Sequence, residues 1–508
     1  MEASGIDVIV VGAGPGGLLL ASELALAGIS CMVLERRPGR SAQSRALGLQ
    51  PRTLELLELR DQAHTFTSMG NPLDHYRLTV GATRLDLHGL DSAFQQLSIL
   101  PQSQTEELLE QRAVELGAVI RRNVEVVGVR QERHRVRVDV RAPDGSETRA
   151  EYASWVVGCD GSHSSVRESL GIGFPGKTYP YNVVVGDVRL ALPPADGMLI
   201  EVGGHGLVVA IDFGNGWWRM GVVDWNTPRD PAQPATVAEL SRGLTGIFGY
   251  DLGLSDPLWM TRFKFQNRHA TTYRQGRVLL LGDAAHVHAP LGAQGLNMSM
   301  QDAMNLGWKL AAVAKGNALA SLLDSYEAER RPVAARVLRA TDAAIRVLMS
   351  KRSPVRLARR AIIPNIARTP VGHRMLTGYI SGLSWSYPSR NGHRRDGITG
   401  RRLPDASLRN GDGRSRRLFE FFRDGKFVLI DQADGRLASA AAPWDHRVAV
   451  LTARIEGHPD LAAHAAILCR PDGYGAWAGG PDDIGALTSE LRRWCGEPAT
   501  ARFTQGQD

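Results

Sequence analysis

Cysteine is scarce in this sequence. The chain has 508 residues but only four cysteines, Cys31, Cys159, Cys469 and Cys495. They form no CxxC pair and show no metal-ligand spacing, so the pattern excludes a disulfide framework and a zinc site. We therefore expect free thiols and no metal.

Long apolar runs are also lacking. Segments such as Val8 to Val11 and Val278 to Leu281 are far shorter than the ~18 residues that span a bilayer. Glu2 and Asp7 stand where a secretory signal would carry positive charge. The sequence therefore predicts a cytoplasmic protein without a membrane partner.

A strong excess of charge of one sign is absent as well. The net charge of +7 arises from 60 Lys plus Arg against 53 Asp plus Glu, and the basic residues are scattered. Where arginine is dense, between Lys351 and Arg402, apolar residues interleave with it at helical spacing, which favours a solvated helix face over a nucleic-acid surface. With 43% hydrophobic and 22% charged residues, the chain is typical of a globular protein of two to three domains.

Glycine, by contrast, is placed with a clear pattern near the N-terminus. A β-branched run from Ile6 to Val11 leads into GAGPGG and then into an apolar segment of helical period that ends at Gly28. Gly12 permits a tight turn, Gly14 lets the backbone approach a pyrophosphate, and Gly17 lets the helix pack on the strand. The order of elements predicts a βαβ dinucleotide site.

The next strand, Ile29 to Leu34, stops at the acidic residue Glu35. A carboxylate at this position accepts hydrogen bonds from an adenosine ribose and repels a 2′-phosphate. The motif therefore favours FAD or NAD over NADP and leaves those two open.

Two later motifs each place a polar turn after an apolar strand. In the first, Trp155 to Val157 is followed by Asp160 and Gly161, and in the second, Val278 to Leu281 is followed by Asp283. A carboxylate at Asp283 suits a ribityl hydroxyl, and the helix that begins near Gly295 offers its N-terminus to negative charge. A reduced flavin carries such charge and a nicotinamide does not.

Taken together, GAGPGG with Glu35, GCDG, GDAAH and GAQGLN resemble the single-component FAD-dependent aromatic hydroxylases along almost the whole chain. The segments SRALGL, PQSQTE and QDAMNLGWKL strengthen the resemblance to bacterial aromatic-polyketide hydroxylases and to rifampicin and phenol monooxygenases. One departure is Ala293, where many relatives have glycine, since the added methyl restricts the loop φ.

The resemblance implies a set of FAD-binding residues. Those expected to touch the cofactor are Gly12, Ala13, Gly14, Pro15, Gly16, Gly17, Glu35, Arg36, Arg45, Gln102, Val126, Asp160, Gly161, Asp283, Pro290, Gly292, Gly295, Leu296 and Asn297. Within this set, Arg45 is expected near the pyrophosphate, Asp283 at the ribitol, and the segment Pro290 to Asn297 along the isoalloxazine ring.

The implied fold is α/β, a Rossmann-like FAD-binding domain with an inserted β-sheet substrate domain and a thioredoxin-like C-terminal domain. We expect residues 1–177 and 270–395 in the first, 178–269 in the second and 396–508 in the third. Alternating strands between Tyr179 and Phe265 agree with the inserted sheet. Without a CxxC motif the third domain cannot exchange disulfides, so we expect it to serve packing or oligomerisation.

The implied activity is that of a monooxygenase that uses FAD, NADPH or NADH, and O2, and hydroxylates a polycyclic phenol of antibiotic biosynthesis through a flavin 4a-hydroperoxide. Because no second GxGxxG is present, the nicotinamide must visit transiently. The same chemistry also serves Baeyer-Villiger oxidation and epoxidation, and a non-catalytic FAD-binding protein is a further alternative.

The substrate wall and the general base are less defined by sequence. Phe213, Trp218, Phe263 and Phe265 are candidates to stack an aromatic substrate, with the sheet core as their alternative role. No pattern identifies a catalytic base, and His286 of GDAAH is interpreted as a structural hydrogen-bond partner rather than a base.

Overall fold

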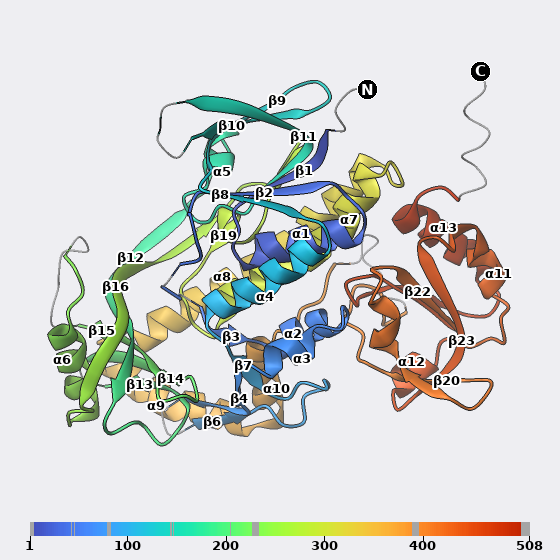
Figure 1. Ribbon diagram of the computed structural model, residues 1–508. Helices are drawn as coiled ribbons and strands as arrows, with labels where there is room; N and C mark the ends of the chain where they lie inside the picture. The colour runs from blue at the N-terminus through green and yellow to red at the C-terminus, as the bar shows by residue number, and fades with distance from the viewer. Residues whose placement is uncertain are drawn as a thin grey trace.

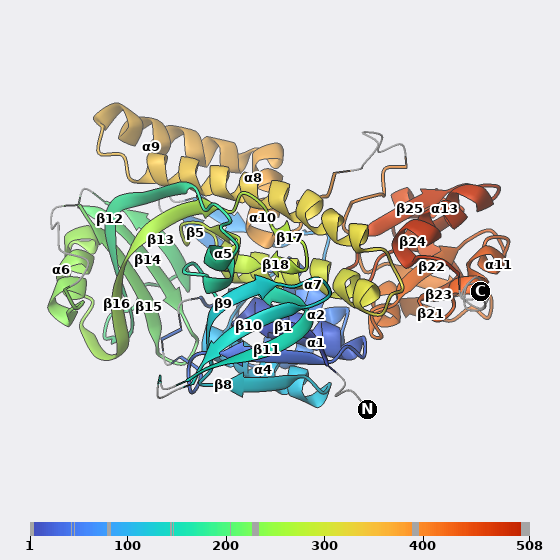
Figure 2. The same cartoon turned by 90° about the horizontal axis from the view of Figure 1, so that it is seen from above.

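The computed structural model describes residues 5–41, 43–44, 46–78, 83–142, 145, 147–203, 205–225, 233–388 and 396–498. Its strands form three larger sheets and one small sheet, with helices between and around them (Figure 1). Seen from above in Figure 2, the sheet of β12 to β16, the N-terminal sheet and the C-terminal unit follow one another across the molecule.

The first sheet has the order β17-β18-β11-β1-β2-β8, and β18, β11, β1, β2 and β8 run parallel. The strands of this sheet are β1 (Ile6–Val11), β2 (Cys31–Glu35), β8 (Val119–Arg122), β9 (Glu125–Gln131), β10 (Val136–Arg141), β11 (Thr148–Gly158), β17 (Arg274–Gln275) and β18 (Val278–Leu280). Four successive residues of β1, Val8 to Val11, are buried, as expected for a parallel strand covered on both faces. The continuous apolar run in β1 therefore reflects its position as a central strand of the sheet.

Helices α1, α4 and α7 pack together beside this sheet, and further helices follow α7 along the chain. Their bounds, in chain order, are α1 (Pro15–Leu26), α2 (Pro51–Glu58), α3 (Ala63–Thr67), α4 (Gln102–Glu115), α5 (Ser165–Ser169), α7 (Gln294–Ala314), α8 (Asp324–Leu348), α9 (Ser353–Arg368) and α10 (Pro370–Ser381). A small sheet of β3 (Gly48–Leu49), β7 (Leu97–Ile99) and β4 (Asn71–Leu73) lies near α2 and α10 in Figure 1.

The second sheet has the order β19-β16-β12-β15-β14-β13-β5-β6. Its strands are β5 (His75–Leu78), β6 (Thr83–Asp86), β12 (Gly176–Leu190), β13 (Met198–Val202), β14 (Gly206–Asp212), β15 (Trp218–Asp224), β16 (Leu254–His269) and β19 (His286–Val287). Helix α6 (Val237–Phe248) packs on β14 and β15. The expected segment 178–269 does not form this sheet alone, because β5 comes from the preceding part of the chain and pairs parallel with β13.

The C-terminal unit has a sheet of order β21-β20-β23-β22-β24-β25. Its elements are β20 (Ser407–Asn410), β21 (Ser415–Arg417), β22 (Phe427–Asp431), α11 (Ala438–Ala441), β23 (Val448–Glu456), α12 (Pro459–Ala462), β24 (Ala466–Cys469), β25 (Gly475–Gly479) and α13 (Ile484–Cys495). Strand β22 runs parallel to β23 and antiparallel to β24, which in turn is antiparallel to β25. This connectivity is that of the thioredoxin fold.

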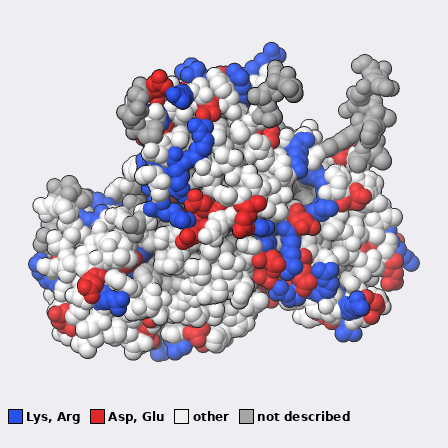
Figure 3. Space-filling view, in the orientation of Figure 1, with Lys and Arg blue, Asp and Glu red and all other residues white. Residues whose placement is uncertain are grey.

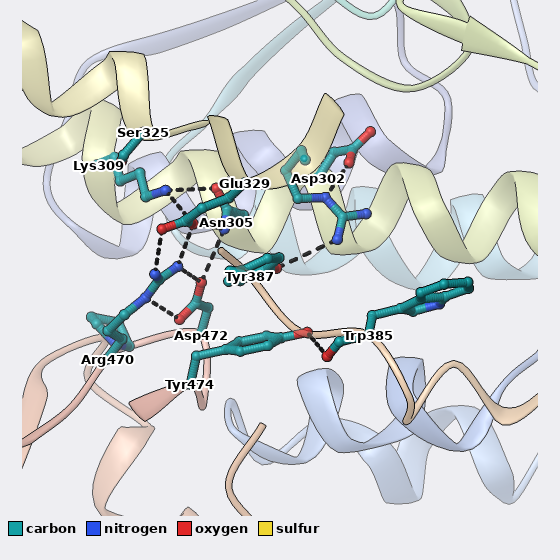
Figure 4. A network of polar contacts seen from close by, with 12 residues as sticks. Asp302, Asn305, Lys309, Ser325, Glu329, Trp385, Tyr387, Arg470, Asp472 and Tyr474 are labelled. Atoms are coloured by element: carbon teal, nitrogen blue, oxygen red, sulfur yellow. Dashed lines mark hydrogen bonds and ion pairs between the residues drawn. The ribbon is translucent and has the colours of Figure 1, made fainter. Parts of the chain in front are cut away.

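Buried charges join the C-terminal unit to α7 and α8 (Figure 4). Arg470, in the turn after β24, donates to the two carboxylate oxygens of Glu329 at 2.7 and 2.9 Å and to Asp472 at 2.6 Å. Lys309 of α7 donates to Glu329 at 2.8 Å. The side chains of Arg470, Asp472 and Lys309 are at most 2% exposed, so these charges are satisfied by one another rather than by water.

The seam between the C-terminal unit and the rest carries charges of both signs at the surface as well (Figure 3). Arg402, Arg417 and Arg423 of the C-terminal unit form ion pairs with Asp91, Glu58 and Asp61, respectively. Among the helices in the described ranges, none is long and apolar enough to cross a membrane.

Candidate functional site

The glycine-rich turn between β1 and α1 is shaped by close contacts on one side and by open space on the other. A Cβ on Gly12, whose φ is +107°, would lie 2.4 Å from the Cys159 carbonyl oxygen, and one on Gly17 would lie 2.1 Å from the Gly12 carbonyl oxygen. Gly14, by contrast, has no atom of the described residues within 4 Å of its Cβ position. Two glycines are therefore required by packing, and the third leaves room for a ligand at the start of α1.

The N-terminus of α1 is available to an anion. The helix begins at Pro15, and its N-cap, Gly14, provides no side chain to accept hydrogen bonds from the first N–H groups. Ala13 and Gly16 are buried within the turn. This arrangement suits a pyrophosphate.

Glu35, at the end of β2, lies against this turn. Its Oε2 accepts from the Ala13 backbone N–H at 2.9 Å and its Oε1 from the Arg37 backbone N–H at 2.9 Å, and the residue is only 6% exposed. The structure thus brings the acidic residue to the glycine turn, where an adenosine ribose is expected. Arg36, the next residue, is exposed, and Arg45 lies outside the described residues.

The Asp160-Gly161 turn is fixed by α5. Asp160 Oδ2 accepts from the Ser165 hydroxyl at 3.1 Å and from the Val166 N–H at 3.2 Å, and the Ser165 hydroxyl also donates to the carbonyl of Val126 at 2.9 Å. Within the described ranges, Asp160 Oδ1 is buried without a hydrogen-bond partner, and burial raises the pKa of this carboxyl. Gly161 has φ +83°, and no atom in the described part of the chain lies within 4 Å of its Cβ position, so these residues leave space open beside the turn.

Gln102 holds the segment that contains SRALGL. Its side-chain oxygen accepts from the Ala46 N–H at 3.1 Å, and its amide donates to Glu106 at 2.7 Å. Its backbone N–H donates to the Ser44 hydroxyl at 2.6 Å. The side chain of Gln102 therefore organises the loop before β3.

Asp283 and His286 lie in one short segment but have different environments. Asp283 is exposed on the 3₁₀ turn Gly282–Ala284, whereas His286 is 1% exposed and its Nε2 lies 2.7 Å from Asp302 Oδ2. Asp302 also accepts from Arg330 Nε at 2.5 Å (Figure 4). Burial alone would raise the pKa of Asp302, but Arg330 and His286 outweigh burial and hold it below its ordinary value. His286 is therefore engaged in structure, and Asp283 is presented outward.

The turn before α7 is clamped from the small sheet. Asn297 Oδ1 accepts from the Gln50 N–H at 2.9 Å, and Asn297 Nδ2 donates to the carbonyls of Gly48 at 2.7 Å and Ala293 at 2.6 Å. The side-chain amide of Gln50 donates to the Gly292 carbonyl at 3.0 Å. The turn that contains Pro290 and Gly292, and the start of α7 with Gly295 and Leu296, are thus held in one shape. Gln50 was missed by sequence reasoning, because no local pattern links it to a turn more than two hundred residues away.

The predicted aromatic wall is divided between two sides of the second sheet. Phe265 is 5% exposed and Phe213 half-buried, and both pack in an apolar cluster that includes Ala289 and Leu291 of the turn before α7. Phe263 is 36% exposed, with its ring centroid 6.0 Å from that of Phe265. Trp218 packs instead in a cluster with Leu240 and Leu244 of α6. Phe213 and Phe265 therefore share an apolar cluster with residues of the turn, and Trp218 belongs to a different cluster.

Comparisons with known proteins agree with this geometry. The family described as "FAD binding domain" matches residues 5–341, and that described as "Aromatic-ring hydroxylase, C-terminal" matches residues 396–498. Anhydrotetracycline monooxygenase of Streptomyces rimosus is 39% identical over 508 residues, which cover 97% of this chain and 99% of that protein. Rifampicin monooxygenase of Streptomyces venezuelae is 37% identical over 493 residues, which cover 96% of this chain and 98% of that protein. The solved structure of an anhydrotetracycline hydroxylase from Streptomyces rimosus has a TM-score of 0.86 at 38% identity and covers 97% of this chain and 99% of its own.

Proposed function

Because the chain belongs to the family of FAD-binding aromatic-ring hydroxylases and is an FAD-dependent monooxygenase, we propose that it hydroxylates a polycyclic, polyketide-type phenol. NADPH or NADH is the proposed transient reductant, and O2 supplies one oxygen atom to the ring and one to water. A cytoplasmic location is part of the proposal.

The residues present fit FAD. Open space above Gly14 and Gly161 leaves room for a ligand along the turns, and Glu35 reaches the first of them. Asp283 is exposed at the end of β18 and would bind the ribitol, while the turn from Pro290 to Asn297 would lie along the ring system. Bound FAD supplies hydride acceptance and O2 activation.

The protein's own contribution to the reaction begins with electrostatics. Helix α7 begins at Gln294, and its N-cap, Ala293, has no polar side chain that could cap the first N–H groups, so its N-terminus favours negative charge on a ligand. Asn297 and Gln50 hold the preceding turn by four hydrogen bonds of 2.6 to 3.0 Å, so this charge-stabilising end is fixed before any ligand arrives.

The single observation that carries the substrate proposal is the apolar cluster shared by the turn and the second sheet. Ala289 and Leu291 of the turn pack in one cluster with Phe265, Met198 and Ile200 of the sheet. Such a surface excludes water from the reacting centre and suits a large, flat, apolar ring system.

The activity is tested by recording the visible spectrum of the purified protein and screening polycyclic phenols for accelerated NADPH consumption with O2 uptake. We expect a flavin spectrum and substrate-stimulated NADPH oxidation. Product mass together with ring analysis separates ring hydroxylation from Baeyer-Villiger oxidation and from epoxidation. Bound flavin without substrate-stimulated oxidation across many phenols would contradict the proposal and favour a non-catalytic binding protein.

The assignment of Asp283 is tested by Asp283→Ala. Loss of a charge-assisted hydrogen bond is expected to weaken FAD binding by roughly tenfold to a hundredfold. The matched control is Asp412→Ala, which removes an exposed carboxylate from the C-terminal unit. Full flavin occupancy in Asp283→Ala after gel filtration would refute the assignment.

A further inference from the structure

Tyr379 of α10 contacts the turn before α7. Its ring carbon Cε1 lies 3.6 Å from the Cβ position of Gly292, and its carbonyl accepts from the side-chain amide of Gln294 at 3.0 Å. Its ring packs edge-on against Trp385 at 5.7 Å between centroids. The Tyr379 ring is therefore held in place by neighbours on both sides.

The hydroxyl of Tyr379 has no hydrogen-bond partner among the described residues, although it is buried. The ring packs against the apolar cluster that contains Phe265 and Leu291. Burial raises the pKa of Tyr379, so this hydroxyl keeps its proton and can donate it. An unpaired buried hydroxyl is costly, which points to a ligand that satisfies it.

His288 presents a second unpaired atom at the other end of the same turn. Its Nδ1 lies 2.9 Å from the Ala289 carbonyl oxygen, which makes Nδ1 the protonated nitrogen and leaves Nε2 as an acceptor. Nε2 is buried without a partner in the described part of the chain and lies 3.9 Å from the Cβ position of Gly295. Burial lowers the pKa of His288 to about 4, so the ring is neutral at pH 7.

The two atoms are chemically complementary. The Tyr379 hydroxyl offers a donor and His288 Nε2 offers an acceptor, both beside the turn assigned to the flavin ring and next to an apolar cluster. A few polar groups in an otherwise apolar surface fix the orientation of a small molecule.

We propose that Tyr379 and His288 are substrate-binding residues, with the Tyr379 hydroxyl donating to a ring carbonyl oxygen and His288 Nε2 accepting from a ring hydroxyl. The pair selects hydroxylated polycyclic ketones over unsubstituted rings of the same size. This inference rests on the proposed hydroxylase function and specifies its substrate class.

The test compares two ligands on the FAD-loaded protein without NADPH, 1,8-dihydroxyanthraquinone and anthraquinone, with dissociation constants measured by fluorescence quenching. For Tyr379→Phe we expect about tenfold weaker binding of both ligands, the value of one hydrogen bond, because each ligand carries a ring carbonyl that accepts from the Tyr379 hydroxyl. The thermal midpoint of the ligand-free protein should stay the same or rise, because only an unpaired hydroxyl is removed.

The matched control is Tyr326→Phe. The Tyr326 hydroxyl is buried and donates to the Leu280 carbonyl at 2.9 Å, so its removal should lower the thermal midpoint without changing either dissociation constant. His288→Asn retains a donor toward the Ala289 carbonyl but removes the Nε2 acceptor. We expect it to weaken binding of the dihydroxy ligand selectively.

Unchanged binding of both ligands in Tyr379→Phe, or equal weakening of both ligands or no change in His288→Asn, would overturn this inference and leave the hydroxylase proposal standing. Weaker binding of both ligands in Tyr379→Phe together with loss of discrimination in His288→Asn, with FAD affinity unchanged, would support it. If the wild-type protein binds neither ligand, the inference falls together with the proposed substrate class. If it binds both but oxidises no phenol, only the proposed function falls.

Discussion

Ala293 has a backbone conformation that a side chain disfavours. Its φ is 53° and its ψ is 32°, in the left-handed region, and it is the N-cap of α7. Asn297 accounts for this conformation, because its side chain donates to the Ala293 carbonyl at 2.6 Å and to the Gly48 carbonyl at 2.7 Å. The sequence-based expectation that Ala293 restricts its loop agrees with this strained geometry.

Replacing Ala293 by glycine should relieve that strain. We expect the folded state to gain about 1 kcal/mol from the relaxed φ, partly offset by the greater freedom of glycine in the unfolded chain. The matched control, Ala314→Gly at the end of the same helix, should lower stability. Chemical denaturation of both variants gives the comparison, and a destabilised Ala293→Gly protein would show that the turn is unstrained.

Helices α1 and α7 approach each other closely because glycines lie at their crossing. A Cβ on Gly16 would lie 2.1 Å from Ser299 Oγ, and one on Gly307 would lie 2.6 Å from Glu23 Cβ. The first of these helices begins at the turn proposed to bind the pyrophosphate, and the second has the N-terminus proposed to face the flavin ring. Their separation therefore sets the separation of the two halves of the proposed cofactor site.

The substitution Gly307→Ala should drive α1 and α7 apart. Alanine improves helix propensity by about 1 kcal/mol, but the contact with the stem of Glu23 is expected to cost more, typically 1–3 kcal/mol for overpacking. In the matched control, Gly246→Ala in α6, the described atom nearest to the new Cβ is His205 Cβ at 3.8 Å, an ordinary contact distance, so stability should rise. Thermal midpoints and FAD dissociation constants of both variants test this prediction. If Gly307→Ala and Gly246→Ala change the thermal midpoint and the dissociation constant alike, the prediction is wrong.

The stability of the whole molecule depends on buried charges that pair across the interface between the C-terminal unit and the rest of the chain. Burial would raise the pKa of Glu329, but Arg470 and Lys309 outweigh burial and lower it to about 2. A carboxyl that titrates lower in the folded than in the unfolded chain stabilises the fold above its unfolded pKa of about 4.3. That stabilisation is lost as the pH falls from about 4.3 to about 2.

Glu329→Gln should therefore differ from the wild type in a pH-dependent way. We expect a loss of stability on the order of 3 kcal/mol at pH 7, which shrinks as the pH falls below about 4.3. Glu147→Gln, an exposed carboxylate on the surface, is the control and should have little effect. Denaturant unfolding at several pH values measures the free energy of unfolding of the wild type and of Glu329→Gln. If the difference between the two stays constant with pH, the ionisation of Glu329 is not its cause.

Contiguous motifs made much of this molecule predictable from sequence. The βαβ unit, the GCDG turn and the GDAAH segment each combine a strand, a turn and a polar residue within a few positions. The fold, the family and the cofactor could therefore be predicted from short stretches of sequence. FAD-dependent monooxygenase activity was predicted and is confirmed by the relatives. The assignments of individual site residues remain predictions.

Long-range partners were not predictable in the same way. Arg470 and Glu329 are 141 positions apart, and charged residues in a helical pattern look like a solvated face until the partner is known. β5 joins the second sheet by a parallel pairing with β13. Because the two strands are far apart in the sequence and no turn motif connects them, this pairing could not be predicted. Tyr379 contacts the turn before α7 because α10 packs beside that turn. The sequence of α10 shows only helical periodicity, so this contact could not be predicted from it.

The hairpin between β24 and β25 carries both Arg470 and Asp472, whose charges lie against Glu329 and Asn305 of the other unit. An engineer who grafts the C-terminal unit of a related enzyme onto this chain must therefore transfer that hairpin in register or redesign its counterpart. Chimeras with a mismatched hairpin would bury an uncompensated ion and should yield insoluble protein, however well the grafted part folds by itself.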